Sequence, residues 1–522
     1  MQLRHVLTYF ALLLILCTCG RAENSSVTDY IQMEPPRTAT PPPPPPAPPA
    51  IEKVAEEELF FSDDAEVEVE HQLAGAIAPT EKLNENHFVA TKDQPTSTFS
   101  IDADGAAYAQ LRRTLREGYP VNPGEVRIEE LLNYFDFDYP YTDPSHPIAL
   151  NGEVSNCPWN ADNQLVRIGI KGRPLAKNER PAANFVFLID VSGSMSGRDK
   201  LPILKEGFKL FVDELGAEDR VAIVTYAGAA GVALPATSGQ QKATIKEAID
   251  ELGSGGGTAG AAGIITAYAI AQQHFIPGGN NRIVIGTDGD FNVGPSSHDE
   301  LIELIEQKRE SGIFLTVLGV GQDNYNDHML EQLANKGNGT MEYIDGPEQL
   351  RKVFIYDYPK FFTVAKDVKV QVKFNPERVA AYRLIGYENR VLANEDFEDD
   401  GKDAGEIGAG QSITALYEVT PRGAAPAGRP AFTIDFRYKE PDAITSRPMR
   451  LAVFDKGISF DQASSYQQFA GAVAAYGMLL RGSEYSGTAK YDDVKNWLLR
   501  SGARDDHGFK QELYELVGRS AK

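Results

Sequence analysis

The chain has 522 residues, which is too long for one hydrophobic core and predicts two to four domains. Its 74 acidic residues outnumber 51 basic ones, giving a formal net charge of −23. Without a basic patch, this acidity argues against nucleic-acid binding and against direct attraction of the globular part to anionic membranes. Of three cysteines only Cys157 lies beyond residue 20, so we expect no disulfide framework and a buried structural thiol.

Residues 1–19 have the pattern of a secretory signal peptide, with a short basic start and an apolar run over residues 6–16. That run is shorter than the roughly 20 apolar residues that a transmembrane helix needs. The stretch LILCTCG resembles a bacterial lipobox, which implies acylation of Cys19; ordinary cleavage and free secretion is the alternative. We therefore expect a cell-envelope protein that faces the periplasm or exterior and meets the membrane through an N-terminal lipid anchor only.

Residues 20–95 have the composition of a disordered linker. Residues 41–49 are proline except for Ala47, which predicts stiff polyproline II at about 3.1 Å per residue. An acidic segment over residues 56–70 follows. The simplest interpretation is a spacer that lifts the globular body off a membrane, and a docking site for a proline-binding module is the alternative.

Residues 96–180 form the first globular segment. The stretch TFSIDADGAAYAQLRRTLREG predicts a strand, a turn and a helix with an apolar face, and a second short helix is expected over residues 127–134. An aromatic cluster follows, which is more typical of a core than of a ligand platform: Tyr134, Phe135, Phe137, Tyr139 and Tyr141. Strands are predicted at residues 152–159 and 166–170.

Residues 181–360 alternate strand and helix, which predicts a parallel sheet with crossover helices. Strands are expected at residues 184–189, 220–226, 282–287, 313–320 and 340–344. Helices are expected at residues 200–215, 240–252, 260–275, 297–311 and 327–335. Two of the apolar strands end on Asp190 and Asp288. In the 3-2-1-4-5-6 order of a doubly wound sheet these two strands are neighbours, at the switch point where such sheets bind ligands.

Asp190 is followed closely by Ser192 and Ser194 in the turn DVSGS. Short oxygen-bearing side chains at alternate positions can converge on a hard cation such as Mg²⁺. Taken alone, the turn favours a helix N-cap instead. Two further stretches favour the metal: the Gly-rich GSGGGTAG, which carries Thr258, and RIVIGTDGDFNVG, which carries Asp288.

Together these stretches resemble the von Willebrand factor type A (VWA) domain and its metal-ion-dependent adhesion site. The resemblance implies that Ser192, Ser194 and Thr258 bind Mg²⁺ or Mn²⁺ directly or nearly so, while Asp190 and Asp288 act largely through water. It also implies a coordination position left for an acidic side chain of a protein partner. The TFSIDAD, RIEELLNYF and CPWN stretches resemble the N-terminal segment of a bacterial family of VWA lipoprotein-like proteins, and the C-terminal part resembles that family's uncharacterised C-terminal region.

Residues 361–522 begin with alternating apolar and polar residues, as over residues 368–374 and 432–438, and end in helices. The alternation predicts half-exposed antiparallel strands. We expect strands before and after the VWA domain to share one sandwich. The predicted fold class is thus α/β: a doubly wound parallel-sheet VWA domain inserted between flanking segments that form a β-sandwich, plus C-terminal helices.

The leading hypothesis for function is a metal-ion-dependent, adhesion-type protein-binding module, not an enzyme. A metal-assisted hydrolase is one alternative, although no His-Glu-x-x-His or Gly-x-Ser-x-Gly motif occurs, and His274 and His298 lie off the metal-bearing turns. A structural envelope protein with a vestigial metal site is another. The Gly-rich loop lacks the phosphate-loop signature. A calcium loop beginning at Asp288 is disfavoured because Val293 stands where glycine is required.

Overall fold

The computed structural model describes residues 84–521, except residues 102–103, 258–259, 290–297, 323–326, 403 and 424–428. The predicted leader with Cys19, the linker up to residue 83, and Thr258 therefore lie outside the described residues. None of the helices in the described ranges combines the length and the apolar character that a membrane span requires.

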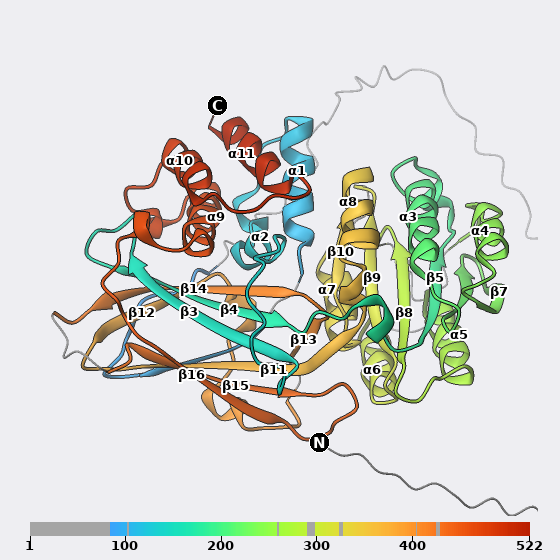
Figure 1. The fold of residues 1–522 in the computed structure, drawn as a ribbon. Coiled ribbons are helices and arrows are strands. Elements are labelled where there is room, and N and C mark those ends of the chain that lie inside the picture. Colours follow the sequence, from blue (N-terminus) through green and yellow to red (C-terminus); the bar gives the residue numbers. More distant parts are fainter. Residues whose placement is uncertain are drawn as a thin grey trace, which may run out of the picture. The chain divides into compact units, whose positions relative to one another are not determined.

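A six-stranded sheet forms the centre of the VWA segment, in the order β10-β9-β8-β5-β6-β7 (Figure 1). The strands are β5 (Ala183–Asp190), β6 (Arg220–Tyr226), β7 (Ala230–Ser238), β8 (Asn280–Thr287), β9 (Phe314–Val320) and β10 (Met341–Ile344). Neighbouring strands are parallel except for the antiparallel pair β6 and β7. Numbered along the VWA segment, this is the predicted 3-2-1-4-5-6 order. Ile189 of β5 lies opposite Gly286 of β8, so Asp190, the last residue of β5, and Asp288, which follows β8, lie at the ends of adjacent strands.

Helices cover both faces of this sheet. They are α3 (Leu201–Glu214), α4 (Lys242–Asp250), α5 (Gly260–Gln273), α6 (His298–Arg309), α7 (Asp327–Lys336) and α8 (Pro347–Arg351). Phe185, Phe187 and Ile189 pack with the residues of α3 and α4, whereas Val186 and Leu188 pack with those of α5, α6 and α7. Burial on both faces explains why β5 is an unbroken apolar run.

The sequence-based prediction missed β7. Its residues, AGVALPATS, lack a strict alternation and include Pro235, which withholds a backbone donor. The pairing with β6 also contains two register shifts. Proline and bulges are typical of edge strands, and β7 is the edge strand of the sheet.

The flanking segments together build two antiparallel sheets. The first has the order β1-β12-β14-β4-β3, and the second has the order β13-β11-β15-β16 with β2 paired to β11. In the first sheet the strands are β1 (Val89–Ala90), β3 (Ile148–Asn156), β4 (Gln164–Gly172), β12 (Val379–Ile385) and β14 (Ser412–Pro421). In the second they are β2 (Thr96–Ser100), β11 (Thr363–Phe374), β13 (Gly405–Gly408), β15 (Phe432–Lys439) and β16 (Arg447–Val453).

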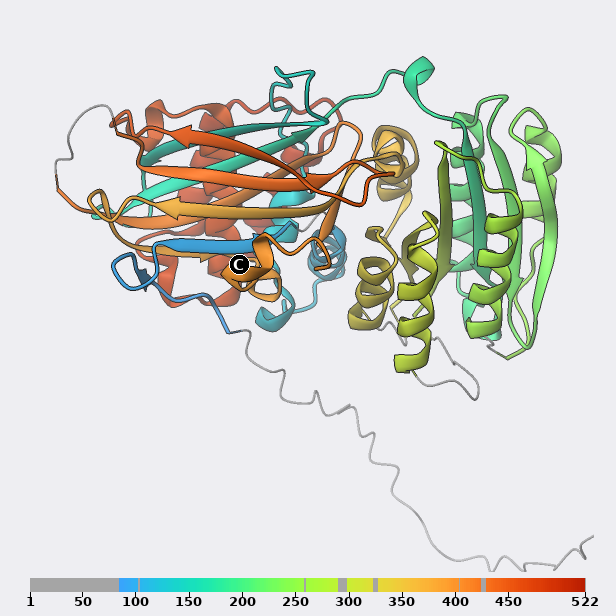
Figure 2. The same ribbon diagram turned by 90° about the horizontal axis from the view of Figure 1, so that it is seen from below.

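Each of these sheets contains strands from both sides of the VWA segment. In Figure 2 the blue strand β2 lies beside the gold strand β11, although more than 260 residues separate them in sequence. Val166 and Ile168 of the first sheet share one apolar cluster with Val370 and Val372 of the second. The prediction that the VWA domain is inserted into a shared sandwich is therefore confirmed.

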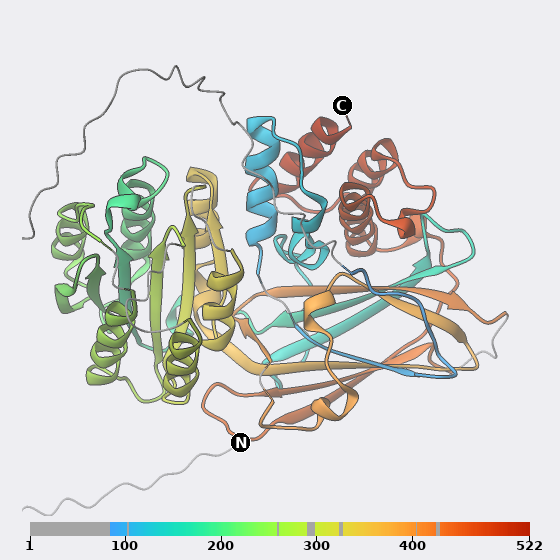
Figure 3. The same cartoon turned by 180° about the vertical axis from the view of Figure 1, so that it is seen from behind.

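Helices cover the outer face of the first sheet (Figure 3). They are α2 (Ile128–Asn133), α9 (Ser465–Arg481), α10 (Tyr491–Ser501) and α11 (Phe509–Ser520). Helix α1 (Ala106–Glu117) packs beside α2 and α11 and against β10, the edge strand of the VWA sheet. Most of the predicted aromatic cluster is buried there, as is the Cys157 thiol. The cluster and the apolar stripe of α9 are thus core, as expected.

Candidate metal centre

The buried carboxylate of Asp190 joins the carboxyl ends of two central strands. Its Oδ1 accepts a hydrogen bond from the backbone N–H of Ser192 at 2.9 Å. Its Oδ2 accepts one from the hydroxyl of Thr287, the last residue of β8, at 3.2 Å. Asp190 therefore ties the DVSGS turn to the neighbouring strand.

The hydroxyl oxygens of Ser192 and Ser194 lie 2.9 Å apart on this turn. Ser192 precedes a short 3₁₀ helix (Gly193–Ser196), but its side chain makes no capping hydrogen bond there. The next α-helix, α3, has Lys200 rather than a serine at its N-cap. The helix-cap interpretation is therefore wrong for these serines, and their hydroxyls converge on each other.

Asp288 directly follows β8 and is fully buried. Its Oδ2 accepts a 3.0 Å hydrogen bond from the ammonium of Lys200, whose side chain is 8% exposed. The sequence patterns did not indicate Lys200 as a site residue. The only signal was a basic residue ten positions after Asp190, which the pattern gave no reason to single out.

The Gly-rich loop is attached to the DVSGS turn by its backbone. Gly193 donates to the carbonyl of Gly256 at 3.1 Å, and Gly255 donates to the carbonyl of Val191 at 2.7 Å. Thr258, two residues further along, lies outside the described residues. The structure thus brings together Asp190, Ser192, Ser194 and Asp288, and fixes the loop that leads to Thr258.

The electrostatics of this edge suit a bound cation. Burial raises the pKa of Asp190 and the nearby Asp288 carboxylate raises it further, while hydrogen bonds from Ser192 oppose the shift. Counting Asp190, Asp288 and Lys200, the edge carries a net charge of −1 when all three are ionised.

The donor set, two hydroxyls and two carboxylates, contains neither thiolate nor imidazole and therefore suits Mg²⁺ or Mn²⁺. Within the part of the chain that the structure describes, no group of three or more His, Cys, Asp or Glu residues could hold a metal. A cation at this edge would therefore depend on the serine hydroxyls. The residues present fit such an ion.

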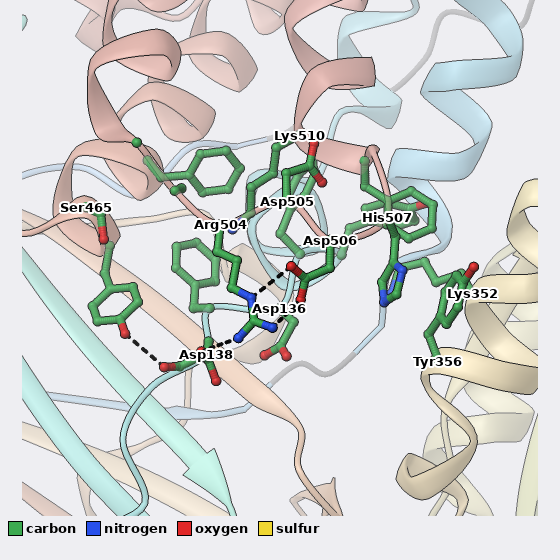
Figure 4. Close-up of a pocket in the computed structure, with 18 of the residues that line it drawn as sticks. Asp136, Asp138, Lys352, Tyr356, Ser465, Arg504, Asp505, Asp506, His507 and Lys510 are labelled. Atoms are coloured by element: carbon green, nitrogen blue, oxygen red, sulfur yellow. Dashed lines mark hydrogen bonds and ion pairs between the residues drawn. The ribbon is translucent and has the colours of Figure 1, made fainter.

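A cavity of about 340 Å³ lies between the flanking segments and the last residues of the VWA segment (Figure 4). It is bordered chiefly by residues 134–138, 352–357, 465–469 and 502–510. The guanidinium of Arg504 reaches Asp138 at 3.6 Å and Asp506 at 2.7 Å, and Lys352 pairs with Asp357. Because most of its charged groups pair with one another, the cavity does not select one class of ligand, and we place the candidate site at the VWA edge.

Comparisons with known proteins agree with this architecture. Residues 184–354 match the model of the von Willebrand factor type A domain, and residues 79–167 match a model described as von Willebrand factor. Residues 359–522 match the model described as the C-terminal part of uncharacterized protein YfbK. VWA domains commonly mediate protein binding and often hold a divalent metal at the adhesion site.

Individual relatives cover different shares of the chain. The chain is 26% identical over 231 residues to the inter-alpha-trypsin inhibitor heavy chain H2 of Sus scrofa, covering 38% of this chain and 24% of that protein. A solved von Willebrand factor type A structure from Catenulispora acidiphila is 19% identical, with a TM-score of 0.40, covering 72% of this chain and 98% of that chain.

A much longer match is to the uncharacterized protein YfbK of Escherichia coli strain K12. The two are 38% identical over 482 residues, which cover 88% of this chain and 83% of that protein. The match spans the flanking segments as well as the VWA domain. The chain therefore belongs to the YfbK family, and in it a VWA domain lies between an N-terminal von Willebrand factor segment and a YfbK C-terminal domain.

Proposed function

We propose that this protein is a metal-ion-dependent protein-binding module that grips an acidic side chain of a protein partner through Mg²⁺ or Mn²⁺. The observation that carries the proposal is the convergence of the Ser192 and Ser194 hydroxyls, 2.9 Å apart, beside the buried carboxylate of Asp190. These groups lie at the carboxyl end of the central strand, the edge where open α/β sheets bind ligands.

Ser192, Ser194 and Thr258 would hold the cation, and Asp190 and Asp288 would orient those hydroxyls and the waters between them. When bound, the metal supplies an electrophilic position that a partner carboxylate can complete. Hydroxyl ligands are neutral, so they leave more of the ion's charge available than direct carboxylate ligands would. The function we propose is therefore binding rather than catalysis.

Manganese binding tests this proposal. The protein lacking residues 1–19 should bind Mn²⁺, observed as loss of the free-ion EPR signal, and should retain a cross-linkable envelope partner until EDTA is added. Asp190→Ala should lose both properties. Asp250→Ala, which removes an exposed carboxylate at the end of α4, should keep both. Equal Mn²⁺ binding by wild type and Asp190→Ala would refute the metal site.

We also propose that the module is tethered in the cell envelope by a lipid on Cys19. The apolar leader, the LILCTCG stretch and the proline-rich linker support this tether. Growth of the producing bacterium with an alkyne-labelled fatty acid should label the wild type and Cys17→Ser, but not Cys19→Ser. Labelling of Cys19→Ser would contradict the assignment.

A further inference from the structure

The buried ammonium of Lys200 is an unusual neighbour for a cation site. It lies 3.0 Å from Asp288 Oδ2, and the two side chains are 8% and 0% exposed. An ion sharing the Asp288 carboxylate would be repelled by this fixed positive charge, since like charges in a poorly solvated site interact strongly. The position of Lys200 therefore influences how tightly the edge can hold a metal.

One set of contacts holds Lys200 from its N-terminal side. Arg113 of α1 donates to Asp199 Oδ2 at 2.8 Å, and Asp199 directly precedes Lys200. The backbone N–H of Lys200 donates to the carbonyl of Gly197 at 3.1 Å, which closes the turn. The N-terminal flank thus fastens the turn that carries the ammonium.

A second set of contacts reaches the side chain of Lys200 through Gly321, the residue after β9. Arg113 donates to the hydroxyl of Tyr343 at 3.0 Å, and that hydroxyl donates to the carbonyl of Gly321 at 2.7 Å. A Cβ atom at Gly321 would lie 2.5 Å from Cε of Lys200, so the lysine stem runs directly against this glycine. Both sets of contacts begin at Arg113 and end at Lys200.

Helix α1 is itself firmly anchored. Its buried Arg112 donates to both carboxylate oxygens of Asp345, at 2.5 and 2.7 Å. Glu117, at the end of the helix, accepts a 2.6 Å hydrogen bond from Gln322, the residue after Gly321. The helix is therefore a rigid support for Arg113 and for the loop beside Lys200.

We propose that Lys200 sets the charge of the metal site and that α1 holds it there through Arg113; this inference rests on the proposed metal-dependent function. With Lys200 in place, a divalent cation meets a net charge of −1 from Asp190, Asp288 and Lys200, and one positive charge is left over to attract a partner carboxylate. Without the ammonium, the two carboxylates neutralise the ion. Lys200 thus weakens metal binding and strengthens binding of the acidic partner, and Arg113 is a positioning residue.

Mn²⁺ titrations followed by EPR test this inference on the chain lacking residues 1–19. We expect Lys200→Met to tighten Mn²⁺ binding by about tenfold, because the repelling charge is gone. Arg113→Gln should tighten it by about threefold, because the ammonium is no longer fixed against Asp288. The matched control is Arg116→Gln on the same helix, whose guanidinium pairs with Glu512 at 2.7 Å; it should leave Mn²⁺ affinity unchanged.

Acetate serves as a probe of the position left for a carboxylate. Its affinity for the Mn²⁺-loaded protein should fall in Lys200→Met, although the metal itself binds more tightly. General damage to the fold would weaken metal binding, so the expected tightening separates a charge effect from a structural one, and melting curves in EDTA check folding. Unchanged or weaker Mn²⁺ binding by Lys200→Met would overturn this inference alone, whereas no Mn²⁺ binding by the wild type would overturn the proposed function with it.

Discussion

The backbone N–H of Gly193 donates a 3.1 Å hydrogen bond to the carbonyl of Gly256, which connects the DVSGS turn to the Gly-rich loop. Gly256 has φ +87°, a left-handed conformation that side-chain-bearing residues rarely adopt. The loop therefore reaches the turn only because a glycine occupies this position. Thr258 follows two residues later, so the same conformation affects where Thr258 can lie.

Replacing Gly256 should disturb the site without unfolding the domain. In Gly256→Ala the left-handed conformation costs about 1 kcal/mol, so Mn²⁺ affinity should fall by about fivefold. Gly253→Ala is the matched control, since its φ is not in the left-handed region and a Cβ there meets no atom within 4 Å. EPR titration measures the Mn²⁺ affinity of both variants. Equal Mn²⁺ affinities of Gly256→Ala and Gly253→Ala would contradict a role of the Gly-rich loop in metal binding.

Asp190→Asn should separate stability from metal binding. The amide can still accept from Ser192 and can donate to Thr287, while the negative charge beside Asp288 disappears. In EDTA we expect Tm to rise by about 2 °C, corresponding to somewhat under 1 kcal/mol. The wild type should gain several degrees on addition of excess Mg²⁺, because a ligand that binds only the folded state stabilises it. A similar Mg²⁺-dependent gain in Asp190→Asn would argue against Asp190 as a metal-site residue.

Arg112→Met tests how strongly the N-terminal flank supports the VWA domain. The substitution leaves Asp345, 3% exposed, without its bidentate partner, and loss of one partner from a buried pair costs about 3–5 kcal/mol. Tm should therefore fall by roughly 10 °C, given about 2–4 °C for each kcal/mol. Arg116→Met removes a guanidinium that is 41% exposed and should change Tm by less than about 2 °C. Thermal melts measure both variants. An equal loss of Tm in Arg112→Met and Arg116→Met would show that the buried pair of Arg112 and Asp345 has no special role.

Asp357 should make stability depend on acid pH. Burial tends to raise its pKa, but the ammonium groups of Lys352 and Lys360 outweigh burial and lower it to about 2. Since the folded pKa lies below the ordinary value of 3.8, the ionised group stabilises the protein above pH ~4, and this contribution is lost as pH falls toward ~2. The shift is equivalent to about 2 kcal/mol.

Melting curves between pH 7 and pH 2.5 measure this contribution. Asp357→Asn should melt well below the wild type at pH 7, because the buried ammonium of Lys352 and the half-buried ammonium of Lys360 lose their partner. The gap should narrow below pH 4. Asp250→Asn removes an exposed carboxylate, so its Tm should equal that of the wild type over the whole pH range. If the difference in Tm between Asp357→Asn and the wild type stays constant down to pH 2.5, the pairing of Asp357 with Lys352 is not its origin.

Local patterns were sufficient to predict much of this protein. The apolar runs that end on Asp190 and Asp288 predicted two buried central strands, because a strand covered on both faces needs apolar side chains at every position. The alternating stretches before and after the VWA segment predicted a shared sandwich, which the pairing of β2 with β11 confirms. The edge strand β7 was missed because its sequence lacks the alternation that identifies strands and includes Pro235, and its pairing with β6 contains two register shifts.

The sequence by itself indicated the oxygen-bearing residues of the candidate site, because DVSGS is a local turn whose serines are two residues apart and because Asp288 ends an apolar run. Only the tertiary structure decided what surrounds them. The ammonium of Lys200 meets Asp288 across 88 residues, and Arg113 reaches Asp199 across 86. Such pairs depend on which ends of strands and helices the fold brings together. No short-range pattern in the sequence predicts these long-range pairs.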